Sequence, residues 1–397
     1  MMYVPDGLAA PTSEEWARSQ QLTALVCQEI HQSQAARISF ARFMALALYT
    51  PGLGYYSSGE SSIFGPQGDF VTAPEISPLF SRCLVQYCQP ILTAFAQQGS
   101  VILELGAGTG RMAADILLAL EQQNCLPTHY WIVEVSEALR VRQQANLRQW
   151  VPHLVDRITH FTQLPTAPIC GVILANEVID ALPVHAFLLR NGVTQERYVA
   201  WNGENFVWQA AEASTALLCQ TLAHLQNHHL PNVDYYNSEI NLKIYNLMKQ
   251  LAQVLEQGYV VIIDYGYPRR EYYHPQRAQG TLRCHYRQRL HNNPFILLGL
   301  QDITSHVDFT QLAEAAHQVD FKIEAFTSQA AFLLACGLLN MSELSYNEGL
   351  TLETNRQIHR LVSPGEMGEL CKVMVLGRGN AIAQRLSLAR WDRQGLL

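Results

Sequence analysis

The chain has 397 residues, of which 48% are hydrophobic and 15% are charged, so it can bury a large core and is not a disordered protein. It has 27 Lys and Arg residues and 34 Asp and Glu residues, and the resulting net charge of −7 disfavours a nucleic-acid-binding protein that relies on bulk positive charge. The length favours two domains, or one domain with insertions.

The nine cysteines are scattered and no CxxC pair occurs, which predicts free thiols in a reducing compartment and no thiolate metal site. The N-terminus lacks the basic and apolar segments of a signal peptide, and no uninterrupted apolar run approaches 18 residues. We therefore expect a cytoplasmic protein without bound metal and without membrane insertion.

The N-terminal region is predicted to be helical and then irregular. Helical spacing of apolar residues begins after Ser13, and a second helical pattern, ISFARFMALALY, ends at Thr50-Pro51. Residues 51–78 are rich in glycine and proline, which is typical of a long loop, and long ordered loops are usually functional.

From residue 100 onward apolar strands alternate with helices, which is typical of a parallel sheet covered on both faces. More than 80 residues separate the fourth and fifth of these strands, which predicts an insertion that contains a hairpin around Asn202-Gly203. The predicted strands are 101–105, 130–135, 157–161, 170–175, 258–266, 321–327 and 372–379, and the predicted helices among them are 111–123, 137–150 and 309–318. The expected parts are a helical cap with a loop at 1–80, a sheet core at 81–185 plus 257–397, and the insertion at 186–256.

A glycine loop, ELGAGTG, lies between the first predicted strand and its helix. Gly106, Gly108 and Gly110 would let the backbone turn tightly and approach a ligand closely, but their GxGxG spacing is not the GxGxxG of dinucleotide-binding proteins. Glu104 precedes the loop, and a carboxylate there would repel a pyrophosphate but suit an ammonium or a sulfonium. Glu134, at the end of the next strand, could accept both hydroxyls of a ribose. S-adenosylmethionine has all of these groups, whereas the alternative is a glycine-rich helix start with a chance surface Glu.

Polar residues also follow the fourth strand, in NEVIDALPV. Asn176, Glu177 and Asp180 would lie at the carboxyl end of the sheet, where open α/β sheets bind ligands. If these residues formed a helical turn, the two carboxylates would share one side and could hold a guanidinium. The alternative for Asp180 is a helix cap ahead of ALPV.

The segment GDFVTAPEIS contains three further candidates, Asp69, Thr72 and Glu75. The segment could close over a cofactor as a lid and exclude water. Alternatively, Ser77-Pro78 begins a helix and Glu75 is favourable near its N-terminus.

Other polar groups are weaker candidates. His306 and Asp302 could form a general acid–base pair, although the helix cap Asp308 is the favoured interpretation of that loop. His224 and His228 lack a third metal ligand at suitable spacing, which favours a solvated helix face over a zinc site.

These segments together resemble the MidA-like family of S-adenosylmethionine-dependent methyltransferases, whose mitochondrial relatives are complex I assembly factors that dimethylate an arginine. The resemblance runs from about residue 38 to 376, and its most specific motifs are GDF-x-T-x-PEIS and NE-x-x-DALPV. The matching segments are 38–56, 68–80, 104–117, 130–143, 176–187, 258–266, 280–287 and 299–309.

The resemblance implies an α/β fold of class I methyltransferase (Rossmann-like) type. Its seven-stranded, mostly parallel sheet would end in an antiparallel pair, with an N-terminal helical cap and an α+β insertion between strands 4 and 5. It also implies cofactor contacts from the three glycines and Glu134. The remaining residues expected to line the site are Asp69, Thr72, Glu75, Asn176, Glu177 and Asp180.

The favoured function is transfer of a methyl group from S-adenosylmethionine to a nitrogen on a partner protein, with Glu177 and Asp180 orienting an arginine guanidinium. The insertion would bind the partner, and a homodimer is possible. One alternative is a small-molecule methyltransferase; another is an assembly chaperone that binds the cofactor without turnover. An NAD(P) oxidoreductase is disfavoured by the glycine spacing.

Overall fold

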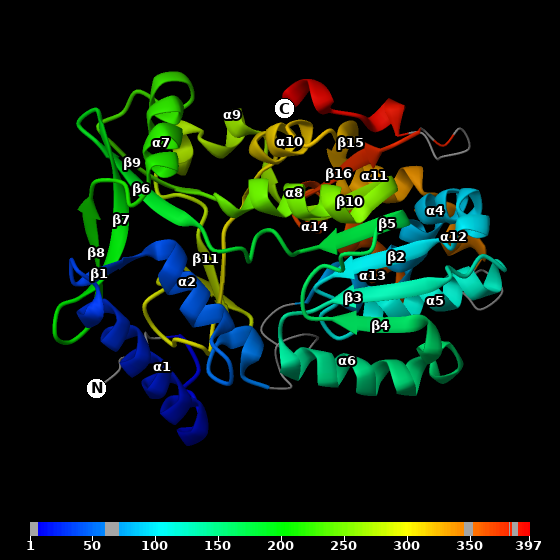
Figure 1. Cartoon of the computed structure of the whole chain (residues 1–397), viewed down its shortest axis with the longest axis horizontal. Coiled ribbons are helices and arrows are strands. Elements are labelled where there is room, and N and C mark those ends of the chain that lie inside the picture. The colour runs from blue at the N-terminus through cyan, green and yellow to red at the C-terminus, as the bar shows by residue number, and fades with distance from the viewer. Residues whose placement is uncertain (1–6, 60–70, 345–351, 381, 383–387) are drawn as a thin grey trace. The chain divides into compact units, whose positions relative to one another are not determined.

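The computed structural model describes residues 7–59, 71–344, 352–380, 382 and 388–397, which form two compact units (Figure 1). Unit 1 comprises Met1–Phe70, Asp180–Ile244 and Tyr267–Asp308, and unit 2 comprises Val71–Ile179, Tyr245–Gly266 and Phe309–Leu397. The chain therefore leaves and re-enters each unit.

Unit 2 contains a mixed sheet in the strand order β15-β16-β10-β5-β2-β3-β4. The strands β2, β3, β4, β5 and β10 are parallel, and β16 runs antiparallel to both β10 and β15. This confirms the predicted α/β class, the mostly parallel sheet and the antiparallel pair at one edge. A two-residue strand, β14 (Val307–Asp308), lies outside this main path. The seven strands of the main path are β2 (Val101–Leu105), β3 (His129–Val133), β4 (Ile158–Phe161), β5 (Ile169–Asn176), β10 (Leu255–Tyr267), β15 (Lys322–Ser328) and β16 (Cys371–Arg378).

Both faces of this sheet are buried, which explains why its strands are almost continuously apolar. Ile102, Val172 and Val261 belong to one core cluster that includes residues of α4 and α5. The alternate residues Leu103 and Ile173 on the neighbouring strands β2 and β5 are also fully buried, so the opposite face is covered as well. The helices of unit 2 are α3 (Ala73–Ile76), α4 (Pro78–Ala94), α5 (Arg111–Gln122), α6 (Glu137–Trp150), α8 (Lys243–Val254, which begins in unit 1), α10 (Phe309–His317), α11 (Gln329–Ala335), α12 (Leu338–Leu344), α13 (Leu352–Val362) and α14 (Met367–Leu370), with short 3-10 turns at Ala96–Gln98, Pro152–Arg157, Ala389–Trp391 and Gln394–Leu396.

The strand order reverses between β2 and β5. From β2 the chain builds outward through β3 to β4, and it then returns to add β5 and β10 on the other side of β2. Loops on either side of such a reversal diverge and leave room for a ligand at the carboxyl ends of the strands. The glycine loop follows β2 and the NEVID segment follows β5, so the fold brings the two predicted motifs to this reversal.

Unit 1 is built on a sheet of order β1-β7-β6-β9, with β8 paired to β7. The pairing of Ile38 with Val199 joins the N-terminal region to the predicted insertion in this one sheet. The expected hairpin around Asn202-Gly203 is confirmed as β7 and β8. The strands are β1 (Arg37–Ser39), β6 (His185–Arg190), β7 (Val193–Trp201), β8 (Phe206–Ala211) and β9 (Tyr235–Ile240), and a second sheet joins β11 (Arg283–Tyr286) to β12 (Arg289–His291) and β13 (Asp302–Thr304). The helices are α1 (Ser13–Gln32), α2 (Phe40–Tyr49), α7 (Ala216–His228) and α9 (Arg269–Tyr272), with 3-10 turns at Tyr55–Ser57 and Pro275–Arg277.

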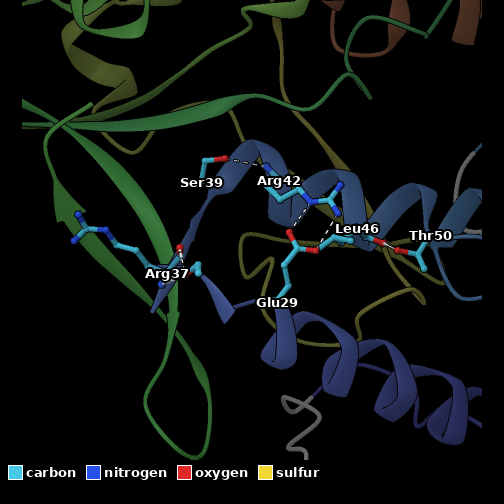
Figure 2. A network of polar contacts seen from close by, with 7 residues as sticks. Glu29, Arg37, Ser39, Arg42, Leu46 and Thr50 are labelled. Atoms are coloured by element: carbon cyan, nitrogen blue, oxygen red, sulfur yellow. Dashed lines mark hydrogen bonds and ion pairs between the residues drawn. The ribbon is translucent and has the colours of Figure 1, made fainter. Parts of the chain in front are cut away.

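Polar contacts fix the start of α2 and tie it to α1 (Figure 2). The Ser39 hydroxyl accepts a hydrogen bond from the backbone N–H of Arg42 at 3.2 Å and so caps the helix. The Arg42 guanidinium donates to both carboxylate oxygens of Glu29, at 2.6 and 2.9 Å. Because the Arg42 side chain is 54% exposed, this ion pair contributes little to stability.

The buried ion pair between Arg269 and Asp308 should matter far more. These side chains are 8% and 5% exposed, with Nε and Oδ2 3.0 Å apart. We expect Asp308→Ala to lower the free energy of unfolding by about 3–5 kcal/mol, because it leaves a guanidinium buried without its carboxylate. The matched surface variant, Glu29→Ala, should cost less than about 1 kcal/mol. Urea denaturation measures both, and equal losses would contradict the buried-charge explanation.

Candidate active site

The glycine loop has the predicted strand–loop–helix geometry. Gly106, Gly108 and Gly110 have φ angles of +62°, +53° and +85°, a left-handed region that favours glycine. The N–H of Gly106 donates to the carbonyl of Val133 on β3 at 2.9 Å. A Cβ atom at Gly106 would lie 3.3 Å from Cγ2 of Val178, so a side chain at this position would also press against the NEVID segment.

Glu134 lies directly after β3, and its side chain is 6% exposed. One carboxylate oxygen accepts the backbone N–H of Ser136 at 2.9 Å, and the other accepts Nε2 of Gln143 at 3.2 Å. Burial raises the pKa of Glu134 above its usual value, while the hydrogen bonds from Ser136 and Gln143 oppose that rise. The carboxylate is thus held in one orientation beside the glycine loop.

Glu104 is more deeply buried than the sequence indicated. Its side chain is 1% exposed and accepts a hydrogen bond from the Tyr130 hydroxyl at 2.6 Å. Burial raises the pKa of Glu104 to about 7, the Tyr130 hydrogen bond lowers it, and the negative charge of Glu134 raises it further. The structure places this side chain inside unit 2, and its contact with a cofactor stays a prediction.

This raised pKa makes the stability of the protein depend on pH. The folded state favours protonated Glu104, so the residue contributes stability that is complete below about pH 4.5 and is lost as the pH rises through about 7. Glu104→Gln mimics the protonated form and still accepts from Tyr130. We therefore expect the stability of this variant relative to the wild type to increase from pH 5 to pH 8, by at most about 1.4 kcal/mol per pH unit. Denaturation curves across that range test this, and a difference that does not vary with pH would refute it.

The PEIS segment lies beside the glycine loop. The Thr109 hydroxyl donates to the Glu75 carboxylate, which connects α3 to the loop. Thr72 is buried at the start of α3, where its carbonyl accepts the N–H of Glu75 at 3.0 Å. The alternative that Ser77 begins a helix is confirmed, because its hydroxyl accepts the N–H of Leu79 at the start of α4. Asp69 lies outside the described residues, and closure of the segment as a lid stays a prediction.

Asn176 is the last residue of β5, and Glu177 follows it with a strained backbone. Glu177 has φ +52°, which is uncommon for a residue with a side chain, and its N–H donates to the Ile263 carbonyl of β10 at 2.8 Å. Nδ2 of Asn176 donates to the Glu177 carboxylate at 3.3 Å. Oδ1 of Asn176 is buried and has no hydrogen-bond partner among the described residues. A buried acceptor without a donor is costly, and strain of this kind persists mainly at functional sites.

Asp264 of β10 holds the segment after Glu177 in place. Its Oδ2 accepts the N–H groups of Val178 at 3.3 Å and Ile179 at 2.8 Å, and the side chain is fully buried. Asp264 lies within the fifth predicted strand, 258–266, and was assigned no role from the sequence. The signal that could have found it is its position at the end of a strand adjacent to β5.

Asp180 does not lie on a helical turn with Glu177. Residues 177–184 form bends and a turn that lead into β6, and no helix follows Asp180. Both the predicted shared helical side and the alternative helix cap are therefore wrong, because Asp264 of β10 binds the N–H groups of Val178 and Ile179 and the chain there bends instead of forming a helix. Asp180 is buried, is the first residue of this segment in unit 1, and its carbonyl accepts the N–H of Ser305 at 3.0 Å.

The weaker candidates have structural partners. Asp302 accepts a hydrogen bond from the Tyr56 hydroxyl at 2.9 Å, and Asp308, which directly precedes α10, is ion-paired with Arg269. His224 and His228 are exposed, as expected.

No group of three or more His, Cys, Asp or Glu side chains in the described part of the chain could hold a metal ion. None of the helices formed by described residues is long and apolar enough to cross a membrane.

This arrangement fits S-adenosylmethionine. The left-handed glycine backbone allows close approach, and the Glu134 carboxylate suits a pair of ribose hydroxyls. The negative charge beside the loop suits a ligand that is cationic, and the partnerless Oδ1 of Asn176 offers a further acceptor.

Comparisons with known proteins agree with this arrangement. A family described as "Putative S-adenosyl-L-methionine-dependent methyltransferase" matches residues 83–327, more than half of the chain. The mitochondrial protein arginine methyltransferase NDUFAF7 of Danio rerio is 27% identical over 379 residues, covering 88% of this chain and 85% of that protein. Its Drosophila melanogaster homolog is 28% identical over 299 residues, and the match spans 68% of this chain but only 65% of the fly protein.

A solved structure is similar over nearly the whole chain. It is a crystal structure from Burkholderia thailandensis of a candidate methyl transferase bound to S-adenosyl-homocysteine. The two chains are 37% identical, the TM-score is 0.89, and the match covers 98% of this chain and all of that one. The α/β fold, the glycine loop and these similarities together show that the chain belongs to this family of S-adenosyl-L-methionine-dependent methyltransferases.

Proposed function

We propose that the chain transfers the methyl group of S-adenosylmethionine to an arginine side chain of a partner protein. The observation that carries the proposal is the meeting of the glycine loop, the buried Glu134 carboxylate and the strained Glu177 at the reversal point of one sheet. The curated relatives are named protein arginine methyltransferases, which supports the choice of nucleophile.

The cofactor-binding part consists of residues on β2, β3 and the adjacent loops. Gly106, Gly108 and Gly110 allow the backbone to approach the cofactor, and Glu134 accepts hydrogen bonds from the ribose. Glu104, Thr72 and Glu75 lie behind or beside the loop, where Glu75 already accepts a hydrogen bond from Thr109. Asp69 completes the set proposed from the family resemblance.

When bound, the cofactor supplies an electrophilic methyl group, and transfer mainly requires that the nucleophile be positioned. Glu177 binds the guanidinium and favours one orientation of its reactive nitrogen. Asn176 donates to Glu177 and so restrains the carboxylate. We propose an assisting role for Asp180, which follows Glu177 by three residues in the chain.

Unit 1, which contains most of the predicted insertion, is the proposed surface for the protein partner. Nucleic acid has no part in the proposed reaction, which agrees with the net charge of −7. A homodimer stays a possibility predicted from the sequence. The expected cytoplasmic location also stays a prediction, and the curated relatives are named as mitochondrial proteins.

A labelling experiment tests this proposal against its alternatives. The purified protein is incubated with methyl-labelled S-adenosylmethionine and a lysate from cells that lack its gene. We expect label in one protein band. Label only in small molecules would favour the small-molecule methyltransferase, and tight cofactor binding without any labelled product would favour the assembly chaperone. A variant of an exposed residue in unit 2, Glu256→Gln near the start of β10, serves as the matched control because it should label normally.

A further inference from the structure

Gln143 joins the two parts of the proposed cofactor site. It lies on α6 and its side chain is fully buried. Its Nε2 donates to the carbonyl of Gly108 at 3.1 Å and to the carboxylate of Glu134 at 3.2 Å. A side-chain amide has two N–H donors, so both are used, one on the glycine loop and one on the carboxylate.

The orientation of this amide is fixed by its surroundings. The reverse orientation would place Oε1 against two further acceptors, the Gly108 carbonyl and the Glu134 carboxylate. In the observed orientation Oε1 is buried and has no hydrogen-bond partner among the described residues. A buried acceptor without a donor costs free energy, so the position is not optimised for stability alone.

The rest of α6 strengthens the connection to the loop. Asn146, three residues further along the helix, donates to the Thr109 carbonyl at 3.0 Å. Ser136, the N-cap of α6, donates its N–H to the second oxygen of Glu134 at 2.9 Å. Both carboxylate oxygens of Glu134 are therefore oriented by α6, and the same helix fixes two consecutive carbonyls of the glycine loop.

We propose that Gln143 is a positioning residue. By donating to both the Gly108 carbonyl and the Glu134 carboxylate, it fixes the orientation of that carboxylate relative to the glycine loop, so that the carboxylate is already oriented to accept hydrogen bonds from the ribose hydroxyls. The proposal rests on the proposed role of Glu134 as the ribose-binding residue. It goes further by assigning ribose selectivity to a residue that contacts the cofactor only through another side chain.

The test uses Gln143→Met in the full-length protein, because methionine has a similar shape but no donors. Affinity is measured by titration calorimetry for S-adenosylhomocysteine and for its 2′,3′-dideoxy analogue, which lacks the ribose hydroxyls. We expect about 10-fold weaker binding of S-adenosylhomocysteine and almost unchanged binding of the analogue, because only the former uses the oriented carboxylate. Gln149→Met is the matched control, since Gln149 is an exposed residue of the same helix.

The possible outcomes separate the inference from the function on which it rests. Equal weakening of both ligands, or weakening of neither, would overturn the positioning role. If Glu134→Gln leaves the affinity for S-adenosylhomocysteine unchanged, the ribose assignment itself fails. If Gln143→Met does not fold, Gln143→Asn keeps the amide on a side chain one methylene shorter, which cannot reach both Gly108 and Glu134, and it should likewise weaken binding of S-adenosylhomocysteine more than binding of the analogue.

Discussion

Glu177→Gln is expected to lower the rate of methyl transfer about 100-fold while leaving cofactor affinity unchanged. The substitution keeps the shape of the side chain but removes the charge that would orient the guanidinium, and misorientation of a reacting group has an effect of this size. Single-turnover assays with methyl-labelled cofactor measure the rate, and calorimetry measures the affinity. Full turnover by this variant would exclude Glu177 from the catalytic machinery.

The backbone at Glu177 provides a second, independent measurement. Because φ is +52° at this position, glycine should fit there better than alanine, and Glu177→Gly should be more stable than Glu177→Ala by about 1 kcal/mol. Both variants should lack activity. Higher stability of the glycine variant together with loss of activity in both variants is expected where backbone strain is retained for function. Equal stability of the two variants would mean that the fold does not enforce the left-handed conformation. The contacts that enforce it are the Ile263 carbonyl and the carboxylate of Asp264.

Glu134→Ala is expected to weaken binding of S-adenosylmethionine about 100-fold, because hydrogen bonds from the two ribose hydroxyls to a charged acceptor would be lost. The catalytic rate at saturating cofactor should change much less, since the residue binds the ribose and not the methyl group. Calorimetry is performed at pH 8, because burial raises the pKa of Glu134 and a higher pH favours its ionised form.

The matched control is Glu137→Ala, which removes an exposed acid in the first turn of α6, three residues after Glu134. This variant should bind the cofactor like the wild type. Unchanged affinity in Glu134→Ala would remove the ribose assignment, and with it the inference about Gln143.

The sheet of unit 2 could be predicted because each of its strands can be recognised from its own residues. A strand buried on both faces reads as a nearly continuous apolar run, as in VILEL, and α6 was predicted over the same residues, 137–150, that it occupies. The glycine loop was predictable for a similar reason: its three glycines are needed locally, by the backbone conformation itself.

The arrangement around Glu177 could not be predicted, because it is set by contacts distant in sequence. Asp264 lies 84 residues after Asp180 in the chain. The sequence of NEVIDALPV does not indicate that Asp264 would accept hydrogen bonds from the N–H groups of Val178 and Ile179. From the sequence a helical turn was considered for Glu177 and Asp180, and the contact with Asp264 instead accompanies a bent segment. Gln143 was missed for a different reason, since a glutamine among Arg and Gln residues of a helix looks like part of a solvated face.

Unit 1 shows the same limit on a larger scale. The pairing of β1 with β7 links residues about 160 positions apart, and the sequence treated these regions as separate parts. Strand β1 has only three residues, and its own sequence does not indicate that it pairs with β7.

The most direct test of the account is the chemical identity of the methylated residue. The labelled protein from the lysate experiment is hydrolysed to amino acids, and the labelled product is identified by chromatography and mass spectrometry. The account predicts methylarginine from the wild type and a strongly reduced amount from Glu177→Gln. Label recovered as methyl-lysine, or released as methanol when a carboxyl methyl ester is hydrolysed, would contradict it, because the site has been interpreted as a carboxylate that orients a guanidinium.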